Sequence, residues 1–387
     1  MKVCFDTFGC RLNRAEALAQ EAGFVSRGWT ATESHADADL IVVRGCSVTA
    51  RAQRDSEKLV EHIMAKYPNK RVVVTGCLKE KRNEAILKDL TLDEIPMKTA
   101  RAYLKVQDGC SGNCSFCIVP QFRGRAASVD FEAVLDKAKR FIDAGYHEIV
   151  VTGCNLSQYN SGGRHIAELV DAMARLDAGC RIRTSSIEPS AAASELVDAM
   201  AENENICRYL HLPIQSGSNM ILSAMRRPYS LKTVEEITSK ALAKMPLVAI
   251  GCDLMVGFPG EGDLELLATK TLFRRIPIAR AHIFSYSERP GTVAATFPNE
   301  VPKEIRHERA HELAELADFE RSRYAKKMVG RDVEIVVEDE NEVAGWTGEY
   351  LWCTVQNKDF AAKFHAKRRD RVKMRVVKSQ GHMLIGN

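Results

Sequence analysis

A regular alternation between short β-branched runs and amphipathic helical patterns constrains the fold of this chain most strongly. In the first 95 residues, strands are predicted at 2–8, 39–45 and 71–76, and helices at 13–28 and 54–67. Strands that alternate with helices of this length are typical of βαβ units, which build a parallel sheet. We therefore expect an α/β fold with an N-terminal parallel domain at 1–95.

The alternation resumes after a linker at 91–107 that leads into a new strand. Further strands are predicted at 147–153, 181–187, 208–214, 248–258 and 279–287, with helices between them. About six parallel β/α units favour a full or partial barrel over 100–325, and the active sites of such barrels lie at the C-terminal ends of the strands. A charged helix at 304–328 then gives way to alternating residues that predict a small all-β module at 327–387.

The composition is that of an ordinary globular chain except for its thiols. Of the 387 residues, 45% are hydrophobic, 27% are charged and twelve are cysteines, and the net charge of +4 only weakly favours an anionic partner. No run approaches the roughly 20 apolar residues of a membrane span, and the N-terminus lacks a secretory signal. We therefore expect a cytoplasmic protein with no membrane partner. A reducing cytosol disfavours disulfides, so clustered cysteines indicate metal binding or catalysis.

Three cysteines, Cys110, Cys114 and Cys117, are spaced Cys-x₃-Cys-x₂-Cys, and two glycines around them allow the backbone to fold tightly. Three thiolates on a [4Fe–4S] cube leave one iron free to bind another molecule. Zinc is the alternative, but a structural zinc site normally has four ligands, and the next cysteine along the chain is Cys154. The spacing therefore favours a cluster with an open iron.

Three further cysteines, Cys10, Cys46 and Cys77, each follow a glycine at the end of an apolar run. Because parallel strands bring their C-terminal ends to one edge of a sheet, these thiols could share a second cluster. The alternative is three buried structural cysteines, since a free thiol is often buried. The residues alone do not decide between the two.

A cysteine motif of this spacing at the start of a β/α domain resembles the radical S-adenosylmethionine (SAM) enzymes. Over nearly the whole chain, the sequence resembles the methylthiotransferases, the MiaB/RimO/MtaB family. The resemblance rests on an ordered series of segments: FGCRLNRAEA (8–17), GCSVTARA (45–52), VVVTGCL (72–78), QDGCSGNCSFCIVPQFRGRAAS (107–128), VVTGCNLSQY (150–159), RIRTSSIEP (181–189), HLPIQSGSNMILSAMRRPYS (211–230), VGFPGE (256–261) and FSYSERPGTVAA (284–295).

The resemblance implies two [4Fe–4S] clusters, with Cys110, Cys114 and Cys117 as catalytic ligands of the SAM-binding cluster. It implies that Cys10, Cys46 and Cys77 hold an auxiliary cluster. SAM would then serve both as methyl donor and as radical source, and an electron donor such as flavodoxin or ferredoxin would be a partner. The predicted SAM contacts are Phe116, Ser186, Glu188, Gln215 and Val256, for which packing or scaffold roles are the alternative.

Two positions depart from the family pattern. Arg44 and Gly45 stand before Cys46, where the family usually has Asn-Thr, and Cys154 is usually not a cysteine. The first departure could change access to the auxiliary cluster without removing a ligand. We interpret Cys154 as an incidental thiol, because cysteine is commonly a small buried residue.

The C-terminal module resembles a TRAM domain, a small RNA-binding β-barrel. Its basic segment supplies the predicted RNA-binding residues Lys363, Lys367, Arg368, Arg369, Arg371 and Lys373. Lysine and arginine stripes bind phosphates, although such runs are also ordinary solvated strand faces. Phe364 and Trp352 could stack on bases or belong to the core.

This basic module favours tRNA, at adenosine 37 of the anticodon stem-loop, over the ribosomal-protein aspartate modified by the RimO branch. The segments GCRLN and SSIEP resemble the MtaB branch, which acts on N6-threonylcarbamoyladenosine, and the isopentenyladenosine substrate of the MiaB branch is the alternative. Arg44, Arg181 and Arg183 are candidate partners for the acidic arm of that base. A scaffold that binds RNA without chemistry is disfavoured by the intact cysteine triplets.

Overall fold

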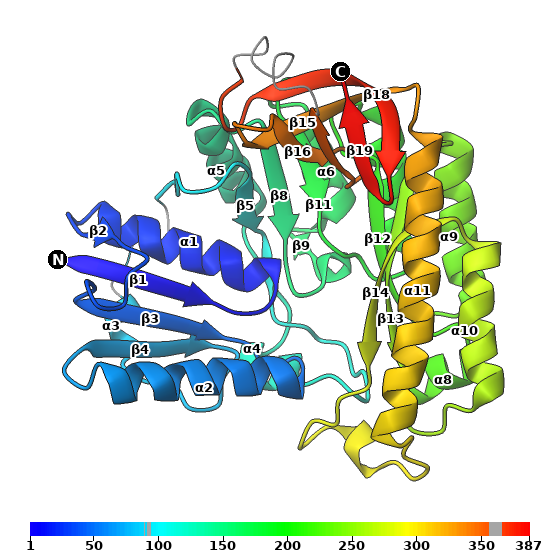
Figure 1. Ribbon diagram of the computed structural model, residues 1–387, viewed down its shortest axis with the longest axis horizontal. Coiled ribbons are helices and arrows are strands. Elements are labelled where there is room, and N and C mark those ends of the chain that lie inside the picture. The colour runs from blue at the N-terminus through cyan, green and yellow to red at the C-terminus, as the bar shows by residue number, and fades with distance from the viewer. Residues whose placement is uncertain (89, 91–93, 356–365) are drawn as a thin grey trace.

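The computed structural model describes residues 1–88, 90, 94–355 and 366–387, which form three bodies (Figure 1). The first is a four-stranded sheet of order β2-β1-β3-β4, in which all the pairs are parallel. Its elements are β1 (Lys2–Thr7), α1 (Arg11–Val25), β2 (Thr30–Ala31), β3 (Leu40–Gly45), α2 (Ala50–Lys66), β4 (Arg71–Gly76) and α3 (Ala85–Lys88).

Alternation of side chains along β3 explains why helices cover both faces of this sheet. Ile41 and Val43 pack on the face that receives Ile63 of α2, whereas Leu40 and Val42 pack on the face that receives Phe24 of α1. A strand buried on both faces reads as a continuous apolar run, as β3 does. The parallel strands all end toward the second body (Figure 1).

The second body, the central barrel, is a partial barrel of two parallel three-stranded sheets. One sheet has the order β11-β8-β5 and the other β12-β13-β14. A backbone hydrogen bond from Ile187 N–H to the carbonyl of His211 links the segment after β11 to β12. The strands are β5 (Ala102–Lys105), β8 (Glu148–Thr152), β11 (Arg181–Thr184), β12 (Tyr209–Gln215), β13 (Ala249–Val256) and β14 (Ile278–Ser285).

Helices cover the outside of these strands (Figure 1). They are α5 (Phe131–Asp143), α6 (Ile166–Ala174), α7 (Ala191–Glu202), α8 (Asn219–Ala224), α9 (Leu231–Lys244), α10 (Asp263–Arg275) and α11 (Lys303–Lys327). Shorter elements lie in the loops: β6 (Gln107–Asp108), α4 (Val119–Arg123), β7 (Ala127–Ser128), β9 (Asn160–Ser161), β10 (Arg164–His165) and the 3₁₀ turns Leu156–Gln158 and Val293–Thr296. No helix among the described residues combines the length and the apolar character needed to cross a lipid bilayer.

The third body is a closed five-stranded barrel of order β15-β16-β17-β19-β18, which confirms the predicted all-β module. Its strands are β15 (Asp332–Asp339), β16 (Ala344–Thr347), β17 (Trp352–Val355), β18 (Arg371–Gln380) and β19 (Met383–Gly386). The predicted fold class, a parallel α/β domain followed by a partial β/α barrel and a small β-barrel, is confirmed.

A buried carboxylate joins the C-terminal barrel to the central one. Glu148, at the start of β8, is fully buried and accepts hydrogen bonds from Arg181 and from Arg183 Nε, the latter at 2.7 Å. The same arginines donate to main-chain carbonyls of the C-terminal barrel at 334, 346, 347 and 348. Burial alone would raise the pKa of Glu148, but Arg183, Arg181 and Arg101 hold it well below its usual range.

Candidate metal centres and their interface

The loop that follows β6 brings the first cysteine triplet together. Cys110 N–H donates to the carbonyl of Gly124 at 3.0 Å, and Cys117 N–H donates to the carbonyl of Cys114 at 3.2 Å, so the loop folds back on itself. A Cβ atom added at Gly112 would lie 3.2 Å from the sulfur of Cys110 and 3.9 Å from that of Cys114. Both sulfurs therefore lie close to this glycine, and a side chain at this position would press against the sulfur of Cys110.

The second triplet gathers at the C-terminal edge of the N-terminal sheet, as the sequence predicts. Cys10 is the N-cap of α1, whereas Cys46 and Cys77 follow β3 and β4 and are buried. A Cβ atom at Gly9 would lie 2.7 Å from the sulfur of Cys46, and Cys77 N–H donates to the carbonyl of Gly45 at 3.1 Å. Burial raises the pKa of Cys46, and the neighbouring thiols Cys10 and Cys77 add to the effect.

The spacing of both triplets fits a cluster better than a single ion. Among the described residues, neither triplet is one of the groups whose three ligand atoms all lie within 4.8 Å of one another. A zinc ion with Zn–S bonds of about 2.3 Å holds tetrahedral sulfurs only about 3.8 Å apart. A [4Fe–4S] cube takes each thiolate on a different iron and spreads the sulfurs further. Neither triplet therefore has the compact sulfur spacing of a zinc site, and a cube does not require it.

Two arginines donate to these sulfurs from outside the triplets. Arg227 Nη1 lies 3.0 Å from the sulfur of Cys114, and Arg123 Nε lies 3.2 Å from that of Cys77. Burial raises the pKa of Cys114 and brings that of Cys117 to about 11, so these thiols are protonated when no metal is bound. Guanidinium donors beside a sulfur favour the thiolate form that metal binding requires.

A cavity of about 210 Å³ lies beside the first triplet, and both the N-terminal sheet and the central barrel contribute to it. Phe116 and Gln215 line it, together with Val48 and Thr49 from the loop after β3. The structure thus brings two of the five predicted SAM contacts together next to Cys117. Glu188 lies nearby, paired with Arg227 at 2.7 Å, and Ser186 is half-buried at the end of β11. Val256 is fully buried in the core and does not line the cavity.

Sequence reasoning missed Asp253, which also lines this cavity. Its carboxylate oxygen Oδ1 lies 3.1 Å from His211 Nε2 and 3.2 Å from His282 Nδ1. Burial alone would raise the pKa of Asp253, but the two histidines hold it well below its usual range, while burial lowers the pKa of His211. A single carboxylate within the apolar run of β13 was the available signal, because a buried charge requires partners.

Two known protein families match this chain, one over the N-terminal sheet and the other over most of the central barrel. Residues 2–95 match the family described as "Uncharacterized protein family UPF0004", and residues 104–273 match the radical SAM superfamily. A threonylcarbamoyladenosine tRNA methylthiotransferase MtaB of Bacillus subtilis is 30% identical, over 90% of this chain and 89% of its own. A tRNA-2-methylthio-N(6)-dimethylallyladenosine synthase of Chlorobium limicola is also 30% identical, over 88% and 87%.

The chain belongs to the radical SAM methylthiotransferase family. Among solved structures, the radical SAM methyltransferase TsrM of Kitasatospora setae has a similar fold, with a TM-score of 0.53 and 12% identity over 73% of this chain and 72% of its own. Membership makes this protein an enzyme and implies a [4Fe–4S] cluster and SAM. Cys110, Cys114 and Cys117 are free thiols that can serve as ligands of such a cluster, and a cavity adjoins Cys117.

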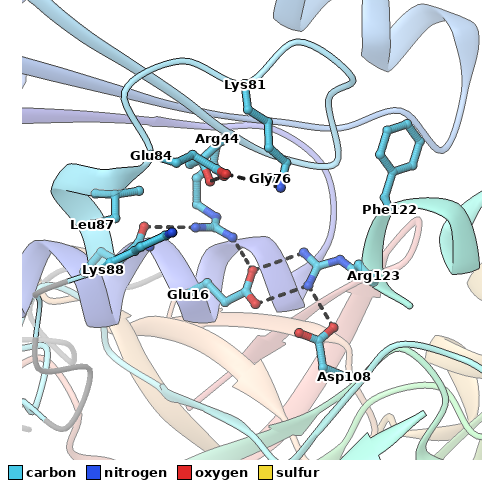
Figure 2. A pocket seen from close by; sticks show the side chains of 12 residues that line it. Glu16, Arg44, Gly76, Lys81, Glu84, Leu87, Lys88, Asp108, Phe122 and Arg123 are labelled. Carbon is cyan, nitrogen blue, oxygen red and sulfur yellow. Dashed lines mark hydrogen bonds and ion pairs between the residues drawn. The ribbon is translucent and has the colours of Figure 1, made fainter. Parts of the chain in front are cut away.

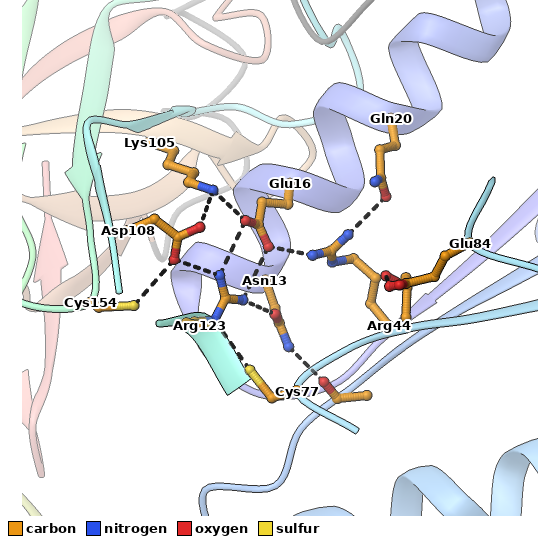
Figure 3. A network of polar contacts seen from close by, with 12 residues as sticks. Asn13, Glu16, Gln20, Arg44, Cys77, Glu84, Lys105, Asp108, Arg123 and Cys154 are labelled. Atoms are coloured by element: carbon orange, nitrogen blue, oxygen red, sulfur yellow. Dashed lines mark hydrogen bonds and ion pairs between the residues drawn. The ribbon is translucent and has the colours of Figure 1, made fainter. Parts of the chain in front are cut away.

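In this methylthiotransferase, Arg123 of α4 connects the N-terminal sheet to the central barrel (Figure 3). Besides Cys77, its guanidinium donates to Asn13 Oδ1 at 2.6 Å, to both carboxylate oxygens of Glu16 at 3.1 Å and to Asp108 Oδ1 at 3.0 Å. Burial alone would raise the pKa of Asp108, but bonds from Lys105 and the charge of Arg123 lower it to about 2. One cation thus fixes α1 and the strand β6 before the first triplet.

Replacing Arg123 by lysine is expected to loosen this interface without unfolding either body. Lysine keeps the charge but cannot donate to four acceptors in one plane. Each buried acceptor that is left without a donor costs about 1–3 kcal/mol of stability. Hydrogen–deuterium exchange should speed up in α1 and β6, and Arg82→Lys, at an exposed position, is the control. Unchanged exchange in α1 would show that Arg123 does not hold the two bodies together.

Arg44, a candidate partner for the acidic arm of the substrate, already has polar partners within the chain. Arg44 is buried and donates to Glu16 and to Gln20 Oε1, the latter at 2.9 Å (Figures 2 and 3). It borders a cavity of about 350 Å³ that also contains Lys81, Glu84 and Arg123, so charges of both signs line this space (Figure 2). Arg181 and Arg183, the other two candidates, are likewise paired within the chain, with Glu148, so for all three arginines a role in substrate binding stays a prediction.

Cys154 lies at the interface and points toward Asp108 rather than into the first triplet. Its sulfur is 3.5 Å from Asp108 Oδ1, and burial raises its pKa to about 12, so the thiol is protonated and donates a weak hydrogen bond (Figure 3). This placement supports its interpretation as an incidental thiol, which stays a prediction.

The predicted RNA-binding residues divide into two groups. Lys367, Arg368 and Lys373 are exposed, whereas Lys363 and Phe364 lie outside the described residues. Arg369 instead donates to the carbonyl of Thr99 at 3.2 Å and stacks on Tyr146, and Arg371 donates to the carbonyl of Gly179 at 2.5 Å. These last two arginines hold the C-terminal barrel on the central one, a role that the charge run did not predict. Trp352 packs edge-on against Trp346.

Proposed function

We propose that this methylthiotransferase adds a methylthio group to C2 of N6-threonylcarbamoyladenosine at position 37 of tRNA. One SAM would be the methyl donor and another the radical source, with an electron donor such as flavodoxin or ferredoxin. Relatives that carry the MtaB name are 30–33% identical over 85–90% of this chain, which supports the proposal. The proposal keeps the domain boundaries that the sequence predicts: 1–95 for the auxiliary-cluster domain, 100–325 for the radical SAM domain and 327–387 for the RNA-binding domain.

The observation that carries the choice of substrate is the lining of the space beside Cys10. Charges of both signs line a cavity of about 840 Å³ there, with positive charge in excess: the cations are Arg11, Arg14, Lys98, Arg101 and Arg368, and the carboxylates are Glu21, Glu33 and Glu338. An acidic threonylcarbamoyl arm suits such a lining, whereas an apolar isopentenyl arm would force charged side chains to lose water without compensation. Lys367, Arg368 and Lys373 supply exposed cations for the phosphates of the stem-loop.

The residues of this chain have distinct roles in the proposal. Cys110, Cys114 and Cys117 would hold the SAM-binding cluster, and Cys10, Cys46 and Cys77 an auxiliary cluster. When bound, these groups supply the carbon-centred radical and the sulfur that a C–H bond of adenine requires. Phe116, Ser186, Glu188, Gln215 and Val256 stay predicted contacts of SAM. The cavity beside Cys10 would hold the substrate base, and the smaller cavity next to Cys117 would be left for SAM.

Isopentenyladenosine 37 is the second candidate, because synthases of that product are also up to 30% identical to this chain. The reconstituted enzyme should be incubated without oxygen with two anticodon stem-loops that differ only in the modification at position 37. We expect methylthiolation of the threonylcarbamoyl stem-loop by nucleoside mass spectrometry. Product from the isopentenyl stem-loop alone would overturn the proposed substrate.

A further inference from the structure

An aromatic side chain surrounded by arginines lies where the three bodies of this enzyme meet. Tyr350, on the turn between β16 and β17, has the guanidinium of Arg11 5.0 Å and that of Arg280 4.6 Å from its ring centre. Arg183 lies at 4.8 Å and Arg101 at 6.0 Å. Burial alone would raise the pKa of Tyr350, but these four cations lower it, so the local field is strongly positive.

Only two of the four arginines have a carboxylate partner. Arg183 is paired with Glu148, and Arg101 Nε lies 2.6 Å from Glu338. Among the described residues, no carboxylate lies within 4.0 Å of the guanidinium of Arg11 or of Arg280. The Nη1 atom of Arg280 is buried and has no hydrogen-bond partner there, although its Nε donates to His282 at 3.2 Å.

Arg11 borders the cavity of about 840 Å³ beside Cys10. Arg280 does not line that cavity itself, but its guanidinium lies against two rings that do, 4.6 Å from the centre of Tyr350 and 5.6 Å from that of Trp346. These two rings stack on each other, with their centres 4.7 Å apart. The side chains of Arg11 and Arg280 are both half-buried, and a buried donor without a partner, such as Nη1 of Arg280, is costly, so this arrangement favours an anion from outside the chain. Guanidinium groups bind planar oxyanions through paired hydrogen bonds, and exposed aromatic faces pack against flat amide or base groups.

We propose that Arg11 and Arg280 bind the carboxylate of the threonylcarbamoyl arm of adenosine 37, while Tyr350 and Trp346 form the wall beside that arm. This assignment rests on the proposed function. Arg11 adjoins Cys10 in the chain, so an anion at Arg11 lies beside the triplet that would carry the sulfur. The arm and the reacting C2 atom belong to one base, and a site next to Cys10 can hold both.

A backbone phosphate of the RNA would satisfy the same arginines, and a binding experiment separates the two sources. Affinity is measured without oxygen on the reconstituted enzyme, with stem-loops carrying either threonylcarbamoyladenosine or unmodified adenosine at position 37. For Arg11→Gln and Arg280→Gln we expect a loss of about 10- to 100-fold for the modified stem-loop, since a hydrogen bond to a charged group contributes about this much. The unmodified stem-loop should bind with nearly unchanged affinity.

Two further variants define the result. Arg11→Lys keeps the charge and should restore part of the preference, and Arg274→Gln, exposed near the end of α10, should leave both affinities as in the parent. Equal losses for both stem-loops would overturn the carboxylate assignment in favour of a phosphate, and unchanged affinities would overturn the site itself. If Arg280→Gln fails to fold, Arg11→Gln alone decides between these outcomes.

Failure of the proposed function would look different. In that case the parent enzyme itself would not methylthiolate the threonylcarbamoyl stem-loop or would bind it no better than the unmodified one. The assignment of Arg11 and Arg280 is overturned only by variants that keep the parent's preference between the two stem-loops.

Discussion

Replacing Cys110, Cys114 and Cys117 together by alanine is expected to halve the iron content of the reconstituted enzyme, from about eight to about four atoms per chain, because each cube holds four. Cleavage of SAM should fall to background. The triplet is the only group of three cysteines within eight residues in this chain, and no other cysteine among the described residues adjoins its cavity. Iron analysis and quantification of 5′-deoxyadenosine measure the two effects.

The complementary change, in which alanine replaces Cys10, Cys46 and Cys77, should also leave about four irons. It differs in its chemical effect: SAM should still be cleaved to 5′-deoxyadenosine, whereas the methylthio product should be absent. A protein with all six thiols intact but with Cys154→Ala is the control and should keep about eight irons. Full iron content in either triple variant would contradict the partition of the six sulfurs into two sites.

The convergence of the second triplet was predictable because it depends only on the topology of the sheet. A thiol placed one residue after the final glycine of a parallel strand must lie at the carboxyl edge, and Cys46 and Cys77 do so after β3 and β4. The first triplet was predictable for another reason, since its spacing within one loop leaves the sulfurs little freedom. The pairing of parallel strands decides the first case and the short loop decides the second, and neither depends on which side chains pack from elsewhere in the chain.

The roles of the arginines were not predictable, because a guanidinium is defined by partners that lie far along the chain. The alternation in RIRT places Arg181 and Arg183 on one face of β11, but their partner Glu148 belongs to another strand. Likewise, Arg44 forms an ion pair with Glu16. Arg369 and Arg371 donate hydrogen bonds to the main-chain carbonyls of Thr99 and Gly179. A run of basic residues in the sequence shows how many cations are present. It does not show which of them pair with carboxylates or carbonyls of a neighbouring part of the fold.

The largest effect on stability is expected for Glu148→Gln, which keeps the shape of the side chain and removes its charge. Arg183 would then be buried without a counter-ion, and Arg181 would keep only Glu334, at 3.9 Å. Breaking a buried ion pair in this way costs about 3–5 kcal/mol. The same arginines hold the carbonyls of the C-terminal barrel, so the damage should extend to β15 and β16. Exchange of amide hydrogens in β8, β11 and β15 should rise together.

An exposed ion pair provides a control that separates the effect of burial from the mere loss of a carboxylate charge. Glu132 pairs with Arg164 at 2.8 Å, but both side chains are exposed, at 66% and 41%, and such surface pairs contribute about 0–1 kcal/mol. Glu132→Gln should therefore change urea unfolding and exchange very little. If Glu148→Gln and Glu132→Gln shifted the unfolding midpoint equally, Glu148 would not be the link that fixes the C-terminal barrel.

The dependence on pH tests the same link without a mutation of the arginines. Because the folded pKa of Glu148 is depressed, its contribution to stability is present above the unfolded carboxyl value of about 4.3 and is lost as the pH falls further below it. The parent enzyme should therefore lose stability more steeply than Glu148→Gln when unfolding is followed from pH 6 down to about pH 3. Parallel curves would mean that the carboxylate is not stabilised by its arginines, and a curve for Glu148→Gln that falls more steeply than the parent would reverse the sign of the argument.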